Sequence, residues 1–489
     1  MRNHPSFFLG AGLGLAVLAG FSALYGNQVT GPKRGRLNVN PPHISTDPSV
    51  KYDYDIVYVR APRDPSGEKP IYFAEVNNPL WMTPGADLML LHPDGSEEVL
   101  VPGGKGAVMD PAVSFDGEWV YYCYIYDLTN ARRHEPPPRG ADIYKIHVKT
   151  RKVVRLTQQV YTPNTGAAYW LGSPPRNRHE EGTNYLQYHG VFHTGPCPLP
   201  GGKVMFTSNR NAFIPPKHSS PCLQLFVMDD DGSNVEQVGF MNLGMALHPV
   251  ILKDGRVMFS SLESQGLRAS TLWGLWSIHP DGTNWGPMLS AFNYGSAAQT
   301  THFQTQLSNG DIVIEEYYQQ NNWGFGTYYK FPVKPPPGQP TFGPANPDDP
   351  RNGRLRVGRH GDGTPVFKAL PFSPYGIESL TPFATPSDFP AGLSDPNDGT
   401  SPRVGKFTHP SGAPDNHLLT VWSPGPVNHN GLHLPLVDAG IYLIKDGKPI
   451  EEPGQMLLIK NDPNYNEQWP RALVPYKRIY GIDEPPRLP

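Results

Sequence analysis

The stretch PVILKDGRVMFSS at residues 249–261 decides the fold. β-Branched and alternating apolar residues flank its Asp-Gly pair, and this pattern is typical of a β-hairpin because Asp-Gly accepts the positive φ angles of a tight turn. Four further stretches repeat the pattern: PAVSFDGEWVYYCY (111–124), PCPLPGGKVMFTSNR (196–210), FQTQLSNGDIVIEEY (303–317) and PSGAPDNHLLTVW (410–422). A hairpin that recurs along a chain indicates a repeat architecture.

A second hairpin follows each of these, for example LWSIHPDGTNWGPML at 275–289. The turns of successive first hairpins end at Gly202, Gly255 and Gly310, in steps of 53 and 55 residues. Two hairpins in about 50–55 residues make one four-stranded blade of a β-propeller. The sequence therefore predicts an all-β propeller of six or seven four-stranded blades.

The number of blades depends on the stretch after Gly310. The next first-hairpin turn ends at Asn416, a step of 106 residues and twice 53, which leaves room for one degenerate unit around Asp362-Gly363. Two β-sandwiches in tandem are the alternative architecture, but they do not require a regular step.

The two ends of the repeat region are each incomplete. WPRALVPYKRIYG (469–481) indicates a strand pair with no following hairpin, and YDIVYVRA (54–61) lacks a clear preceding pair. We expect these ends to share the first blade and to close the ring, since closure removes exposed sheet edges.

The N-terminus carries an uncharged run, FFLGAGLGLAVLAGFSALY at Phe7–Tyr25. Its length is close to the ~20 residues that span a bilayer as a helix, so we predict a hydrophobic helix within residues 1–26. This helix is either a cleaved signal sequence or an uncleaved membrane anchor, and both alternatives place the rest of the chain in the periplasm or otherwise outside the cytoplasm. A linker at 27–50, the propeller at 51–482 and a tail at 483–489 follow.

Composition limits the partners and cofactors. The 41 Lys and Arg residues nearly balance 44 Asp and Glu residues, so no global field attracts nucleic acid, and no nucleic-acid partner is expected. The three cysteines give no disulfide framework; Cys197 and Cys222 can pair in an oxidising compartment, whereas Cys123 is predicted to be a buried thiol. No CxxCH motif occurs, so no covalently attached c-type haem is expected.

Several phrases resemble known propeller repeats. VSFDGEWVYY (113–122), ADIYKI (141–146) and LFVMDDDGSN (225–234) resemble the TolB-type repeat. PCPLPGGKVMFTSNR, GKFTHPSGAP (405–414) and VWSPGPVNHN (421–430) are similar to the propeller part of the hydrazine synthase alpha-subunit family. The resemblance implies a propeller in an exported protein. In that family the propeller sits between haem domains, and the complex joins nitric oxide with ammonia; the haem-attachment motif of those domains is absent here.

A column of equivalent residues offers a candidate site. When the first hairpins are aligned on their turns, Asp110-Pro111, His248-Pro249 and His409-Pro410 share one column, Gly195-Pro196 fits it, and His302 falls one place before it. Innermost strands surround the channel of a propeller, so these positions should converge there. Neutral imidazoles bind divalent transition metals. The candidate metal ligands are His193, His248, His302, His409, His429 and His433, with Gln304 and Asn428 to complete the set. The simpler alternative is that His-Pro only caps a strand entry.

Three functions remain in competition because no nucleophile elbow, HExxH, P-loop or dinucleotide fingerprint follows a strand. The first is an exported docking or accessory subunit of a cell-envelope complex, with envelope proteins as partners and the membrane contacted through the N-terminal helix. The second is a metal-dependent enzyme with its site in the channel. The third, by analogy, is a haem-free subunit of a nitrogen-metabolism complex. Whether the chain is an enzyme stays open.

Overall fold

The computed structural model describes the following residues: 37–63, 84–129, 139–160, 191–211, 213, 222–238, 244–262, 273–289, 300–317, 325–335, 337–338, 374, 376–384, 405–425 and 437–489. The hydrophobic helix predicted within 1–26 lies outside these residues, as do Asn428, His429 and His433. Among the described helices, none is long and apolar enough to cross a membrane.

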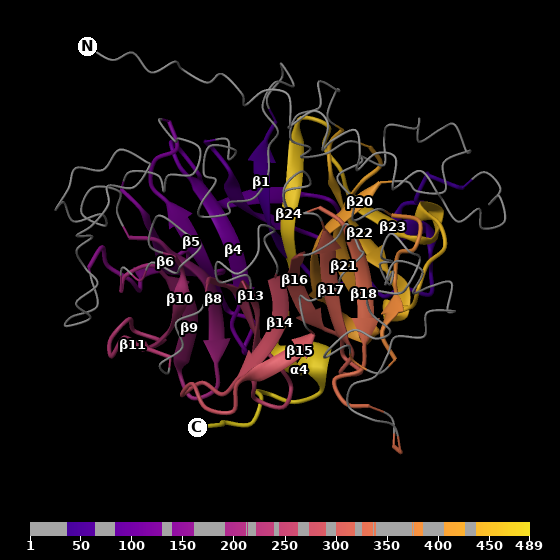
Figure 1. The fold of residues 1–489 in the computed structure, drawn as a ribbon. Coiled ribbons are helices and arrows are strands. Elements are labelled where there is room, and N and C mark those ends of the chain that lie inside the picture. Colours follow the sequence, from indigo (N-terminus) through magenta and orange to yellow (C-terminus); the bar gives the residue numbers. More distant parts are fainter. Residues whose placement is uncertain are drawn as a thin grey trace, which may run out of the picture.

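In the described part of the chain the strands form six four-stranded blades, each antiparallel within itself (Figure 1). Blade 1 consists of β24 (Tyr465–Ala472), β1 (Ile56–Pro62), β2 (Asp87–Leu91) and β3 (Glu97–Val101). Blade 2 consists of β4 (Ala107–Val113), β5 (Trp119–Ile125), β6 (Ala141–His147) and β7 (Val153–Arg155). Blade 3 consists of β8 (His193–Leu199), β9 (Lys203–Ser208), β10 (Gln224–Asp229) and β11 (Glu236–Gln237).

The second half of the ring repeats this plan. Blade 4 consists of β12 (Ala246–Ile251), β13 (Val257–Leu262), β14 (Trp273–Ile278) and β15 (Gly286–Leu289). Blade 5 consists of β16 (Thr300–Gln306), β17 (Ile312–Tyr317), β18 (Thr327–Phe331) and β19 (Glu378–Ser379). Blade 6 consists of β20 (Lys406–Gly412), β21 (Leu418–Ser423), β22 (Gly440–Ile444) and β23 (Leu457–Lys460). The remaining short elements are the 3-10 helices η1 (Ile44–Thr46), η5 (Pro414–Asn416), η6 (Lys445–Gly447) and η7 (Pro453–Gln455), and the α-helix α4 (Tyr476–Tyr480).

The predicted closure of the ring is confirmed. β24, from the C-terminal end, pairs antiparallel with β1, with Ile56 opposite Ala472 and Pro62 opposite Tyr465 (Figure 1). The second half of the predicted strand pair at 469–481 is wrong, because α4 follows β24 there after Pro475.

The sequence left six and seven blades open, and the structure has six; Asp362-Gly363, where the degenerate seventh unit would fall, lies outside the described residues. Blade 5 joins blade 6 directly, since the Gly412 N–H donates to Thr305 Oγ1 at 3.0 Å and the Tyr328 hydroxyl donates to the Thr408 carbonyl at 2.5 Å. The long step belongs instead to the segment 332–377, which joins β18 to β19 within blade 5.

The hydrophobic core lies between neighbouring blades rather than inside any one of them. One cluster joins Met205 and Leu225 of blade 3 to Val257 and Phe259 of blade 4, and further clusters lie between the other neighbouring blades. A blade is thus covered on both faces, which is why β13 is buried along its whole length. Residues 37–50, predicted as part of a linker, also pack here: Ile44 is buried, and Pro42 accepts a backbone hydrogen bond from Leu458 of blade 6.

The three cysteines are buried, and no two of them form a disulfide with each other. Cys123 is the buried thiol that the sequence predicts, and its pKa is raised by burial. The pairing considered for Cys197 and Cys222 is not formed.

The strands end at two different faces of the ring. The turn face carries the short turns between the first two strands of blades 2 to 6: 114–118, 200–202, 252–256, 307–311 and 413–417. The connection face is where the second strand of each blade is joined to its third, through 63–86, 126–140, 209–223, 263–272, 318–326 and 424–439. The C-terminal segment (473–489), which includes α4, lies on the turn face, where the Tyr476 N–H donates to the Phe115 carbonyl and the Asp281 N–H donates to the Pro489 carbonyl.

Candidate functional site in the central channel

Each innermost strand is interrupted by a β-bulge at the same place. The pairing register shifts there, for example between Leu247 and Val250 in β12. The bulge residue has a positive φ in every blade: Asp110 (51°), Gly195 (58°), His248 (54°), Phe303 (48°), His409 (50°) and Trp469 (48°). Five of the six are not glycine, although this conformation costs an L-residue about 1–2 kcal/mol. A bulge re-aims a side chain, and all six residues, which we call the bulge ring, line one cavity.

The bulge ring contains the column that the sequence aligned and adds two residues to it. Phe303, directly after His302, represents blade 5, and Trp469 represents blade 1. The residue directly after the bulge residue is proline in five blades: Pro111, Pro196, Pro249, Pro410 and Pro470. Proline is tolerated there because a bulge interrupts the ladder of N–H donors. Gln304 takes this place in blade 5, where its Nε2 donates to the His248 carbonyl and its Oε1 accepts from Ser260 Oγ at 3.0 Å.

The channel histidines lie close together but do not face a common point. The Phe303 ring lies between His248 and His409, at centroid distances of 4.2 and 4.4 Å. The His302 ring lies 5.4 Å from that of His248 and 4.5 Å from that of Trp273, and it is not among the residues that line the cavity. His248 and His302 are therefore neighbours, whereas His409 is separated from both by an aromatic ring.

His193 lies in a different place, between blades 2 and 3. Its Nε2 is 3.1 Å from the Gln158 carbonyl and 3.7 Å from Asp142 Oδ1. The Asp142 carboxylate is fully buried, and it accepts hydrogen bonds from Tyr126, Thr157, Arg155 and Gln159. Burial lowers the pKa of His193 to about 4, so its imidazole is neutral in this inter-blade cluster.

The metal centre expected from the sequence stays a prediction. Among the described residues, no group of three or more His, Cys, Asp or Glu side chains is arranged to hold a metal ion. His429 and His433 lie outside those residues. His248 and His302 are the neighbouring pair of imidazoles that could contribute ligands to such an ion.

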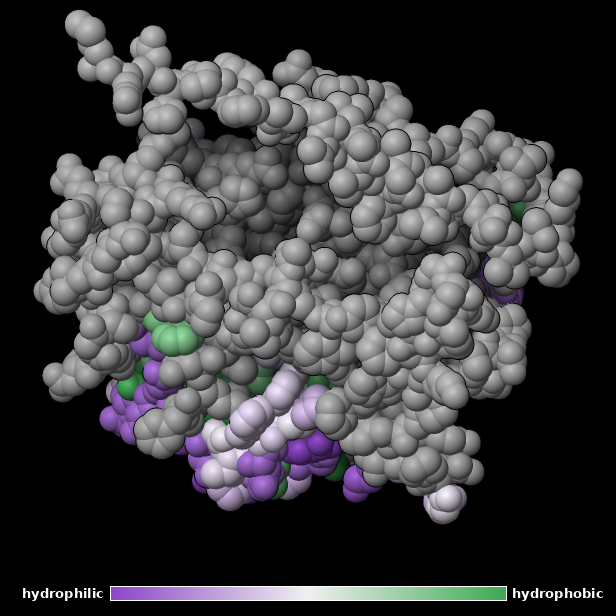
Figure 2. Space-filling view, viewed as in Figure 1, coloured by the Kyte–Doolittle hydropathy of each residue, from purple (hydrophilic) through white to green (hydrophobic). Residues whose placement is uncertain are grey.

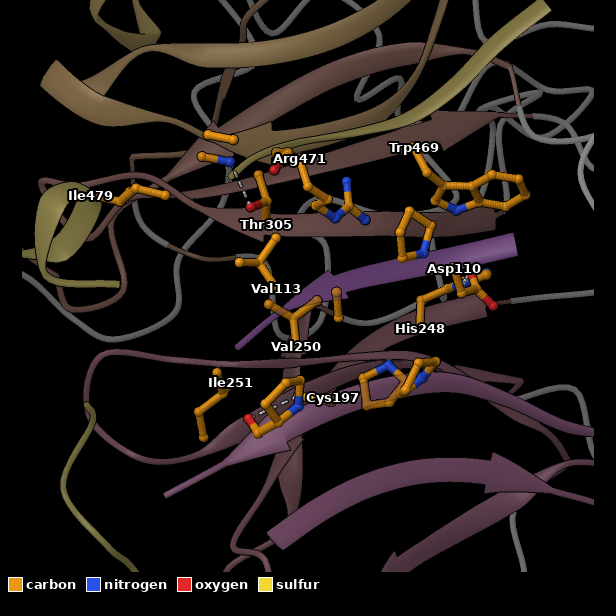
Figure 3. A pocket seen from close by; sticks show the side chains of 18 of the residues that line it. Asp110, Val113, Cys197, His248, Val250, Ile251, Thr305, Trp469, Arg471 and Ile479 are labelled. Atoms are coloured by element: carbon orange, nitrogen blue, oxygen red, sulfur yellow. Dashed lines mark hydrogen bonds and ion pairs between the residues drawn. The ribbon is translucent and has the colours of Figure 1, made fainter. Parts of the chain in front are cut away.

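Sequence reasoning missed the cation of the channel, Arg471. It follows the bulge of β24 by two residues, and its guanidinium extends between the bulge ring and Ile479 of α4 (Figure 3). Burial lowers the pKa of Arg471 to about 10, opposed by the negative charge of Asp110, so the side chain stays charged at neutral pH. The Trp469-Pro470 dipeptide was the available signal, because it repeats the X-Pro pattern of the column and places Arg471 on the same strand.

Burial keeps several further titratable groups near the ring neutral. Burial lowers the pKa of His302 and of His409 well below the ordinary histidine value, and neighbouring cationic or imidazole groups lower it further. Glu315, opposite His302 in the β16–β17 pair, has its pKa raised well above the usual range by burial, despite contacts with the Thr408 hydroxyl and the His409 N–H. Tyr480 of α4 has a pKa raised to about 12 by burial. Of the residues that line the cavity, Arg471 carries the one guanidinium and Asp110 the one carboxylate.

Asp110 itself is nearly buried and held by its neighbours. Its Oδ2 accepts the Gly195 N–H at 3.2 Å, and its Oδ1 lies 3.8 Å from His248 Nδ1. The carboxylate and the imidazole thus stand side by side at one end of the cavity, with Trp469 across from them (Figure 3).

Comparison with known proteins places the fold. No protein-family model matches the sequence, and no curated protein is significantly similar to it. Among solved structures, hydrazine synthase from Kuenenia stuttgartiensis is similar, with a TM-score of 0.52 and 15% identity over 88% of this chain. TolB from Acinetobacter baumannii gives a TM-score of 0.42 at 12% identity, covering 87% of this chain and 68% of that one. A Hadza microbial sialidase gives a TM-score of 0.40 at 12% identity, covering 88% of this chain and 87% of that one.

This chain covers 48% of the hydrazine synthase chain, about half its length. At 15% identity that likeness shows the fold alone, and it confirms the propeller that the sequence resemblance implied.

Proposed function

We propose that this protein is an exported β-propeller that serves as a docking or accessory subunit of a cell-envelope complex and presents its connection face to a partner protein. The observation that carries the proposal is the difference between the two faces. Long segments such as 126–140 and 424–439 join strands at the connection face, whereas the chain's own C-terminal segment covers part of the turn face. Binding residues concentrate on loops that a rigid scaffold positions. The uncharged run Phe7–Tyr25 supports export.

The surface of the turn face is consistent with this arrangement. In Figure 2 the coloured surface lies towards α4 and the C-terminus and is mostly hydrophilic. A polar surface of this kind fits contact with water.

Site-specific photo-cross-linking in intact cells tests the proposal. Blade 2 offers a matched pair of exposed threonines: Thr129 lies in the connection 126–140, and Thr150 lies in the turn that joins β6 to β7. A photoreactive residue at position 129 should give one reproducible adduct with an envelope protein, identified by mass spectrometry, and the same residue at position 150 should not. An adduct from position 150 alone, or none from either, would contradict the proposal.

Export is tested separately. Residues 1–26 fused to a reporter that is active only outside the cytoplasm should give activity, and the fusion without these residues should not. An inactive fusion would show that the chain stays inside the cell.

The pair His248 and His302 favours a second candidate, a channel that binds a divalent transition metal for catalysis by a bound water. Elemental analysis of the purified full chain should then give a stoichiometric metal that the His248→Ala variant lacks. Equal metal content in the two proteins, or none in either, would remove this candidate.

A further inference from the structure

The cavity in the channel is a chamber between two defined ends. The bulge ring forms one end, and α4 with Tyr476, Ile479 and Tyr480 forms the other (Figure 3). Its volume is about 170 Å³. A protein cavity of about 150 Å³ holds a ring of six carbon atoms, so this chamber suits a molecule of similar size.

A cation with unused hydrogen-bonding capacity stands in this chamber. Among the described residues, Arg471 donates one hydrogen bond, from Nη1 to the Pro470 carbonyl at 3.0 Å, and it has no carboxylate within ion-pairing distance. A guanidinium has five N–H donors in a planar fork that fits a carboxylate. Burial destabilises the charged form of Arg471, which is why its pKa is lowered. Arg471 is therefore built to receive an anionic group.

The bulge-ring end of the chamber suits a cationic group, whereas Arg471 suits an anionic one. Asp110 supplies a carboxylate there, and the rings of Phe303, His409 and Trp469 stand beside one another, with His409 4.1 Å from Trp469 between centroids. Aromatic faces and a carboxylate both attract a cationic nitrogen. His248 Nε2 is buried there with no hydrogen-bond partner in the described residues, so it offers one further polar contact.

We propose that the chamber binds a small zwitterion, with its carboxylate on Arg471 and its cationic amine or methylammonium group between Asp110 and the aromatic rings. A simple anion would satisfy Arg471 but would meet the repulsion of Asp110. A simple cation would pair with Asp110 but would be repelled by Arg471. A molecule with both charges, of about the size of a small amino acid, pairs both ends at once. This inference does not depend on the proposed docking function.

The test is calorimetric titration of the full chain with four probes. Glycine and trimethylglycine carry both charges, whereas acetate and tetramethylammonium carry one each. At least one zwitterion should bind ten times more tightly than either single-charge probe. Equal affinities for the four probes, or no binding of either zwitterion, would overturn the proposal.

Variants assign the two ends. Asp110→Asn keeps a residue that tolerates a positive φ, and it should weaken the zwitterion about tenfold while strengthening acetate. Arg471→Gln should abolish binding of both carboxylate probes, and Arg471→Lys should restore a part of it, which separates lost recognition from lost folding. An unchanged preference for zwitterions in Asp110→Asn, or unchanged affinity in Arg471→Gln, would show that these two side chains do not recognise the charged groups of the probe.

Discussion

The turn face and the connection face end the same strands in different ways. On the turn face, β12 and β13 are joined by residues 252–256, and the C-terminal segment lies across several such turns. On the connection face, β21 and β22 are joined by 424–439. Short, covered turns restrict sequence and length, whereas long connections can change without disturbing the sheets. The turn face is thus the more constrained of the two, whereas the segments of the connection face can change.

The strand β24 links the two faces, because its N-terminal half lies on the connection side of the bulge at Trp469 and its C-terminal half leads into α4. It is the innermost strand of blade 1, and Gln468, Trp469 and Ala472 are buried in it. The largest effects of mutation on stability should therefore come from β24 and from the C-terminal segment that follows it.

Truncation after residue 464 should give the largest effect. It removes β24 and the C-terminal segment, so β1 loses its inner neighbour and the ring is left open with an unpaired edge. We expect loss of the cooperative thermal transition and association in size-exclusion chromatography. Truncation after residue 481 removes only the end of the C-terminal segment and serves as the control. A cooperative transition at the wild-type temperature in the shorter protein would show that the ring does not need its latch.

A matched pair of glycines tests the cover on the turn face itself. Gly117 and Gly95 both lie in turns with positive φ, 76° and 85°. A Cβ at Gly117 would stand 2.7 Å from the Pro475 nitrogen, whereas a Cβ at Gly95 would meet nothing within 4 Å. Gly95→Ala should cost about 1–2 kcal/mol from backbone strain alone. Gly117→Ala should cost a further 1–3 kcal/mol, roughly, because the C-terminal segment must shift.

Chemical denaturation of both variants measures this difference. Equal losses of stability at the two positions would mean that the C-terminal segment moves aside freely, and the turn face would then not be a fixed cover.

The sequence predicts the parts of this fold that repeat. Asp-Gly turns at regular spacing and β-branched flanks are local signals, so blade composition, ring closure and the column of Asp110, His248 and His409 could all be predicted. The number of blades could not be fixed, because the segment 332–377 mimics the length of a further unit. The direct contacts between blades 5 and 6 exclude it.

The site was less accessible to sequence reasoning because it depends on where a bulge falls within each strand. His302 drew attention as a histidine, yet the bulge in β16 is at the next residue, so Phe303 enters the channel and His302 packs on Trp273. Arg471 had no repeat partner to mark it. The histidines along the chain raised a metal centre as one candidate, whereas the three-dimensional arrangement also puts Arg471 in the chamber beside Asp110 of the aligned column.

A pH-dependent effect concerns the connection end of β24, where Glu467 is fully buried. Its Oε1 accepts the Asp462 N–H at 3.1 Å, and Oε2 has no hydrogen-bond partner among the described residues. Burial raises the pKa of Glu467 well above its ordinary value. The unfolded chain therefore loses this proton near its ordinary pKa while the native protein retains it, and stability falls as the pH rises between the two pKa values, by up to about 1.4 kcal/mol per pH unit.

Glu467→Gln keeps the shape of the side chain and removes this titration. The variant and the wild type should be equally stable at pH 4, and the variant should be increasingly the more stable of the two as the pH rises above the unfolded-state pKa, towards neutrality. Denaturant unfolding at successive pH values measures the difference, with Glu484→Gln, an exposed carboxyl in the C-terminal segment, as the control that should show no such trend. A wild-type advantage that grows with pH would mean that Glu467 is ionised and paired in the native protein. The connection end of β24 would then owe its stability to charge rather than to burial, and the covered turn end would differ from it in this respect.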